Sequence, residues 1–131
     1  MLWFPLIGTQ RRVYADLLRQ LKMRTQDDMP AWEVYPKEIR ELAEKVTAIV
    51  IERLRWPKTS IFIPDDPADI PFWDRTGHLV DVETMLELAK QLGTKCEDVD
   101  WDIFWQDLPR LTYGKAIERI NDMMAGQGGA W

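Results

Sequence analysis

The sequence predicts an all-α fold, a four-helix bundle with an additional N-terminal helix. Apolar residues recur every three or four positions in several stretches that end at proline or glycine. No alternating run is long enough for a sheet. With 131 residues, 46% of them hydrophobic, the chain suffices for one packed domain. We expect an N-terminal helical extension over residues 1–36, a helical domain over residues 37–125 and a flexible glycine-rich tail over residues 126–131.

The N-terminal extension combines a short apolar run with an amphipathic helix. The run lies over residues 2–7, and Thr9 is the predicted cap of a helix over residues 10–23. We expect the segment to pack on its own bundle or on a second copy in a homodimer, and the sequence leaves both open. The predicted apolar face of the helix consists of Val13, Tyr14, Leu17, Leu18 and Leu21.

The clearest helix of the sequence covers residues 37–54. Pro36 suits the position before its first turn, and the helix ends before the Trp56-Pro57 pair. A long loop over residues 55–77 follows, in which several prolines exclude a regular helix. We expect its apolar residues to hold it on the core. The predicted buried stripe of the helix consists of Ile39, Leu42, Ala43, Val46, Ile49, Val50 and Leu54.

Three further helices are predicted over residues 79–92, 97–107 and 113–124. Gly93 ends the first, and Thr112 caps the last. The predicted inward residues of the first are Leu79, Val82, Leu86 and Ala89, with Met85, Leu88 and Leu92 beside them. Those of the second are Val99, Ile103, Phe104 and Trp105, and those of the third are Tyr113, Ala116, Ile117, Ile120 and Met123.

The charge is acidic and unevenly distributed. The net charge is −5, which argues against a nucleic-acid partner. Residues 1–60 hold eight acids against eleven bases, whereas residues 61–108 hold twelve acids against three bases. Such a molecule attracts a basic partner to its acidic half. The twelve acids are Asp65, Asp66, Asp69, Asp74, Asp81, Glu83, Glu87, Glu97, Asp98, Asp100, Asp102 and Asp107.

The sequence also indicates a compartment. Cys96 is the single cysteine, so the chain forms no internal disulfide and no cysteine-rich zinc site. One free thiol fits a cytoplasmic protein. No secretory signal is recognisable, and no stretch reaches the roughly 20 apolar residues that a membrane-spanning helix needs. We therefore expect a cytoplasmic protein without a membrane span.

The order of elements over residues 37–125 resembles that of acyl carrier proteins. A long helix is followed by a long loop, an acidic helix, a short helix and a final helix opened by a threonine. The segment from Val82-Glu83 to Leu88 is similar to the start of the family's second helix, and the segment from Leu111 to Asn121 to its last helix. The resemblance implies that the second helix meets partner proteins. Asp81, Glu83 and Glu87 are therefore the candidate partner-binding residues, and a basic surface is the expected partner.

One departure from the family decides the functional expectation. The family carries Asp-Ser-Leu at the start of its second helix, and the serine binds the phosphopantetheine arm. Here the aligned triplet is Gly77-His78-Leu79, which offers no such hydroxyl. We therefore expect a noncatalytic interaction module that carries no cofactor and no metal. Two alternatives stay open: carriage on a non-standard hydroxyl such as Thr76, and a small metal-binding protein that uses His78 with Asp74 and Asp81.

Overall fold

The protein is an all-α helical bundle. The computed structural model describes residues 6–24, 31–74, 77–93 and 98–127. Within these residues there is no β-strand, and extended segments meet only in two isolated bridges, Pro67 with Thr112 and Trp73 with Leu79. The helices are α1 (Leu6–Met23), α2 (Lys37–Leu54), α3 (Val82–Gln91), α4 (Asp98–Asp107) and α5 (Tyr113–Gln127), with short 3-10 helices η2 (Ile70–Phe72) and η3 (Leu108–Arg110).

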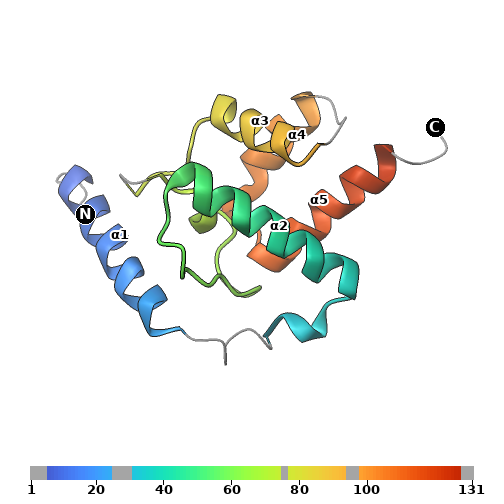
Figure 1. Cartoon of the computed structure of the whole chain (residues 1–131). Coiled ribbons are helices and arrows are strands. Elements are labelled where there is room, and N and C mark those ends of the chain that lie inside the picture. The colour runs from blue at the N-terminus through green and yellow to red at the C-terminus, as the bar shows by residue number, and fades with distance from the viewer. Residues whose placement is uncertain (1–5, 25–30, 75–76, 94–97, 128–131) are drawn as a thin grey trace.

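Helix α2 lies at the centre of the fold. It packs against α5, α3 and η2, while α3 packs against α4. Figure 1 shows α3 and α4 together on one side of α2 and α1 at the far edge of the molecule. The predicted stripe of α2 is confirmed, because six of its seven residues are buried and Ile49 is half-buried. The largest fully buried side chains of the core are Tyr113, Phe104, Met85, Leu108, Ile117, Ile120, Val50 and Pro71.

Three helix boundaries differ from the prediction by three or four residues. Helix α1 begins at Leu6, so the prediction that Thr9 caps it is wrong. Helix α3 begins at Val82 rather than residue 79, because the Asp81 side chain accepts a hydrogen bond from the Thr84 backbone and so fixes the first turn there. Helix α5 extends to Gln127, into the expected tail. The bounds of α2 are those that the sequence predicts.

The buried face of α4 also differs from the prediction. Val99 and Ile103 were expected to point inward, but they are 56% and 47% exposed. Phe104 is buried as predicted, Trp101 is buried in place of Val99 and Ile103, and Leu108 continues the same face beyond the end of the helix. A ten-residue helix buries only one side, and two large aromatic rings remove more apolar area from water than Val99 and Ile103 would.

Tryptophan indoles attach the long connection between α2 and α3 to the bundle. The Nε1–H of Trp32 donates to the carbonyl of Phe62 at 2.9 Å, and that of Trp56 donates to the carbonyl of Pro71 at 3.0 Å. The rings themselves are buried. The connection has no helix or strand ladder for most of its length, so these side chains satisfy backbone groups that would otherwise be buried without partners.

The N-terminal helix is held by apolar contacts and by one ionic contact. Leu21 is 3% exposed in the core, and Leu17 and Leu18 pack against it, so this part of the apolar face of α1 packs on its own bundle. Beyond the end of the helix, Arg24 donates two hydrogen bonds of 2.7 Å to the carboxylate of Asp66 and a third, of 2.8 Å, to the carbonyl of Ile61. Residues 2–5 of the predicted apolar run lie outside the described residues.

The connection also caps the last helix. The backbone N–H groups of Tyr113 and Gly114 donate to the carbonyls of Asp66 and Pro64, at 2.8 and 3.0 Å. These are N–H groups of the first turn, which have no partner inside their own helix. The predicted cap Thr112 contributes a longer bond, since its Oγ1 accepts from the backbone of residue 115 at 3.4 Å.

Gly114 lies where no side chain fits. A Cβ built there would stand 2.7 Å from the Cζ of Tyr35 and 2.9 Å from the Cβ of Pro64, with the Tyr35 hydroxyl closer still. We therefore expect Gly114→Ala to lower the free energy of unfolding by about 3 kcal/mol through overpacking. Urea denaturation measures the change.

The matched control for this substitution is Gly93→Ala. Gly93 has a φ of 75° but open space around it, so alanine there should cost only about 1 kcal/mol of backbone strain. Adding Tyr35→Phe to Gly114→Ala removes the closest atom and should recover part of the loss. Equal effects of the two glycine substitutions would contradict this packing.

The Arg24–Asp66 pair should contribute more than an exposed pair. Its side chains are 20% and 11% exposed, so Arg24→Ala leaves a largely buried carboxylate without its cation. We expect a loss of about 3 kcal/mol. The exposed pair of Arg19 and Asp16 is the control, and Arg19→Ala should change stability by less than about 0.5 kcal/mol. Similar losses in urea denaturation of the two variants would refute the difference.

Candidate functional site

The predicted partner-binding residues lie at the beginning and on the outer side of α3. Asp81 is the N-cap, and its Oδ1 accepts the backbone N–H of Thr84 at 2.8 Å. The hydrogen bonds from Thr84 favour the charged carboxylate and lower the pKa of Asp81 below its ordinary value. The residue with the predicted docking role therefore also stabilises its own helix.

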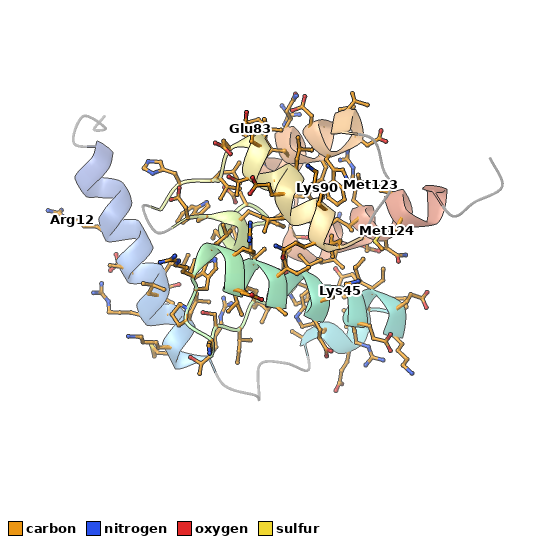
Figure 2. All side chains as sticks on the ribbon, turned by 45° about the horizontal axis from the view of Figure 1, so that its top comes forward. Arg12, Lys45, Glu83, Lys90, Met123 and Met124 are labelled. Carbon is orange, nitrogen blue, oxygen red and sulfur yellow. The ribbon has the colours of Figure 1, made fainter. Side chains whose placement is uncertain are left out.

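Glu83 and Glu87 are one helical turn apart and exposed. Figure 2 shows Glu83 pointing away from the bundle. Glu87 lies 3.4 Å from the guanidinium of Arg53 on α2, in a pair whose side chains are 61% and 44% exposed. The opposite face of α3 is anchored in the core through Met85 and Leu88. The three predicted acids are thus held on one rigid helix, which keeps their negative charge in solvent.

The triplet Gly77-His78-Leu79 lies in a turn before α3 rather than at its start. The backbone N–H of Asp74 donates to the carbonyl of His78 at 2.8 Å, and Leu79 forms an isolated bridge with Trp73. Gly77 has a φ of 82°, which an aspartate at that position would adopt only with strain. His78 therefore lies in a turn before the helix, and residues 80 and 81 separate the triplet from the first helical residue, Val82.

The alternative metal site is not formed by the described residues. No group of three or more histidine, cysteine, aspartate or glutamate side chains lies close enough to hold an ion in the described parts of the chain, and this includes Asp74, His78 and Asp81. His78 is exposed. Thr76, the alternative hydroxyl, lies outside the described residues.

Among the residues that the structure describes, no helix has the length and apolarity required to cross a bilayer.

A groove of about 1150 Å³ lies beside α2, on a side of this helix other than the one that packs against α3. One wall is the face of α2 that runs from Arg40 through Thr47 and Ile51 to Arg55, and the other is the beginning of the connection, over residues 56–62. Trp32, Trp56 and Phe62 line it with aromatic surface. The rings of Trp56 and Phe62 pack edge to face with their centroids 5.2 Å apart, and this contact fixes this part of the wall.

Next to the groove, a buried tyrosine connects α5 to α2 through a side-chain hydrogen bond. The hydroxyl of Tyr113 lies 2.7 Å from Oγ1 of Thr47, which lines the groove. Burial raises the pKa of Tyr113 far above its ordinary value, with the nearby charge of Asp66 adding to the shift and the bond to Thr47 opposing it. Tyr113 is therefore a neutral structural hydrogen-bonding group and no candidate acid or base.

Two polar groups of the groove wall have no partner. Ser60 is 9% exposed, and its hydroxyl makes no hydrogen bond within the described residues. The Nε atom of Arg40 also makes no hydrogen bond within the described residues. This atom is buried, although the Arg40 side chain as a whole is half-buried. Buried polar atoms of this kind cost about 1–3 kcal/mol each when they are left unpaired. Both residues line the groove, so the free protein retains hydrogen-bonding capacity there.

The sequence did not predict this groove. Its wall on α2 begins at the edge of the buried stripe, at Ala43, and continues over residues that periodicity classifies only as solvent-exposed. The signal that was available is the small size of Ala43, Thr47 and Ala48, which leave room beside a loop that contains large rings.

Comparisons with protein-family models, with curated proteins and with solved structures find no match to this chain.

The cap of α3 gives a pH-dependent prediction. A carboxylate with a lowered folded-state pKa contributes stability above its unfolded value, and this contribution is lost as the pH falls through the folded value. Asp81→Ala should therefore lower the melting temperature near neutral pH, and the difference from the unaltered protein should shrink below the ordinary value of 3.8. Asp81→Ser retains an uncharged cap, so its melting temperature should fall less. A pH-independent effect of Asp81→Ala would exclude a contribution from the charge.

Proposed function

We propose that the protein is a noncatalytic, acyl-carrier-like interaction module that docks on a basic surface of a partner protein through Asp81, Glu83 and Glu87. It lacks the phosphopantetheine attachment serine, since Gly77-His78-Leu79 stands in place of the family's triplet. The single cysteine fits a cytoplasmic location for this function.

The observation that carries the proposal is the rigid outward presentation of the α3 acids. Met85 and Leu88 are 1% and 4% exposed and fix the inner face of the helix, so the backbone that carries the acids needs no ordering when a partner binds. Their part of the chain is also the acidic half of the molecule. Charge of one sign on a fixed helix increases association rates with a basic partner and orients the encounter.

The surface beside α3 is suited to the same role. Val99 and Ile103 are exposed on α4, which packs against α3, and they are spaced one turn apart. Asp100 is exposed between them. Interfaces combine an apolar contact with a charged rim, so these residues supply apolar area next to the acids.

The test is a charge reversal of the acidic face. In Glu83→Lys combined with Glu87→Lys, a partner isolated with the unaltered protein should bind at least about tenfold more weakly and with a reduced dependence on salt. Stability should change little, because the lost pair with Arg53 is exposed. Isothermal calorimetry with the purified partner at two salt concentrations measures both effects.

The matched control reverses two acids on another helix. Glu118 and Asp122 are exposed on α5 at the same four-residue spacing. Glu118→Lys combined with Asp122→Lys changes the net charge equally but leaves α3 intact. Equal weakening by the two double variants would mean that net charge alone drives binding and would refute the assignment to α3.

A further inference from the structure

The groove between α2 and residues 56–62 has features of a binding site that the acidic face does not use. The core-facing side of α2, with Val46 and Val50, points toward α3, whereas the groove lies on the side of Arg40, Thr47 and Ile51. The two surfaces therefore belong to different faces of one helix, so that both can be occupied together.

The dimensions of the groove favour a peptide over a small molecule. Its volume of about 1150 Å³ exceeds the range of roughly 300–1,000 Å³ that is usual for small-ligand clefts. Its wall on α2 runs from Arg40 to Arg55, a span of about 22 Å at 1.5 Å per residue. An extended chain of about seven residues at 3.3 Å per residue covers that length.

The charges that line the groove are unpaired. Glu33, Glu44, Glu52, Arg40, Arg55 and Lys58 all line it, and none of them forms an ion pair with any described residue. Unpaired charges around an aromatic floor leave ionic interactions available to a bound molecule.

The six charges are also ordered along the groove. Arg55 and Lys58 outnumber Glu52 near the end of α2, whereas Glu33 and Glu44 outnumber Arg40 near its beginning. One end is therefore net positive and the other net negative. A complementary ligand carries its own charges in the opposite order, with apolar side chains between them against Trp32, Trp56 and Phe62.

We propose that this groove binds an extended peptide segment of a partner protein, about seven residues long, with acidic residues at one end, basic residues at the other and apolar residues between. The acidic end lies by Arg55 and Lys58, and the basic end by Glu33 and Glu44. A polar group of the peptide supplies a partner for the hydroxyl of Ser60, after a rotation about its χ1 bond.

The first experiment selects ligands without assuming a sequence. A phage library of random seven-residue peptides is panned on the full-length protein, and an enriched peptide is synthesised with a fluorescent label for anisotropy titration. We expect enriched sequences with acids at one end and bases at the other. Enrichment of no peptide, or of peptides without this charge order, overturns the proposal.

The second experiment places the selected peptide in the groove. Ala48 is exposed and lines the groove, so Ala48→Trp fills it without entering the core and should weaken binding at least about tenfold. Ala15→Trp changes an exposed alanine on α1 and is the matched control. Circular dichroism and melting temperature verify that both variants are folded. Equal affinity of the two variants overturns the proposal.

The third experiment tests orientation and the unpaired hydroxyl. Arg55→Glu with Lys58→Glu should reject the selected peptide and accept a version in which lysines replace its acids. Ser60→Ala should weaken binding about fivefold without destabilising the free protein, because the hydroxyl has a partner only in the complex. Binding that ignores the charge swap overturns the proposal. A dimer in sedimentation that Ala48→Trp dissociates also overturns it, because it assigns the groove to a second copy.

Discussion

Asp66 joins three parts of the chain that are distant in sequence. Its carboxylate accepts hydrogen bonds from Arg24 and from the backbone N–H of Ile63, while its own carbonyl accepts from the backbone N–H of Tyr113. The side chain thus orders the connection around itself and fixes the end of α1 upon it, and the peptide group fixes the connection on α5. A side chain that accepts all of these hydrogen bonds must be a carboxylate. Because this carboxylate is largely buried, the protein is stable only when the cation of Arg24 lies beside it.

The groove depends on this arrangement. Its outer wall is irregular backbone with no ladder of its own, and hydrogen bonds from Arg24 and from the indole of Trp32, to the carbonyls of Ile61 and Phe62, help to hold it in place. The acidic face depends on it much less, since α3 is fixed by apolar contacts with α2 and α4. The two proposed sites therefore differ in kind: one is a preformed charged helix, and the other is a cleft whose width is set by tertiary hydrogen bonds.

The helices could be predicted because their apolar spacing is regular. The bounds of α2 follow from its stripe and from Pro36, and the buried residues of α5 from Tyr113 through Ile120 are those expected. The buried face of α4 could not be predicted, because Val99, Trp101, Ile103 and Phe104 place apolar residues on several sides of one short helix. Only the position of α3 and η2 decides which side is covered.

The candidate sites likewise include features that the sequence predicted and features that it did not. Asp81, Glu83 and Glu87 were predicted to be exposed acids of one helix because local periodicity determines which side faces solvent. The first residue of α3 could not be placed, since the capping aspartate Asp81 competes with an apolar pattern that continues through Leu79 and Val80. The groove joins residues of α2 to a segment beyond its end, and no local pattern reports that two such segments leave space between them.

Three tryptophans that donate hydrogen bonds to the connection give the protein an internal optical reporter. Trp32 and Trp56 each donate their indole N–H to a carbonyl of the connection, and Trp105 donates to the carbonyl of Val80 at 2.8 Å, just before α3. Opening of the connection breaks these bonds and transfers the buried rings of Trp32 and Trp56 into water, which shifts their fluorescence to longer wavelength. Because these two rings also line the groove, two of the seven tryptophans that contribute to the emission spectrum of the unlabelled protein lie in the wall that a ligand would contact.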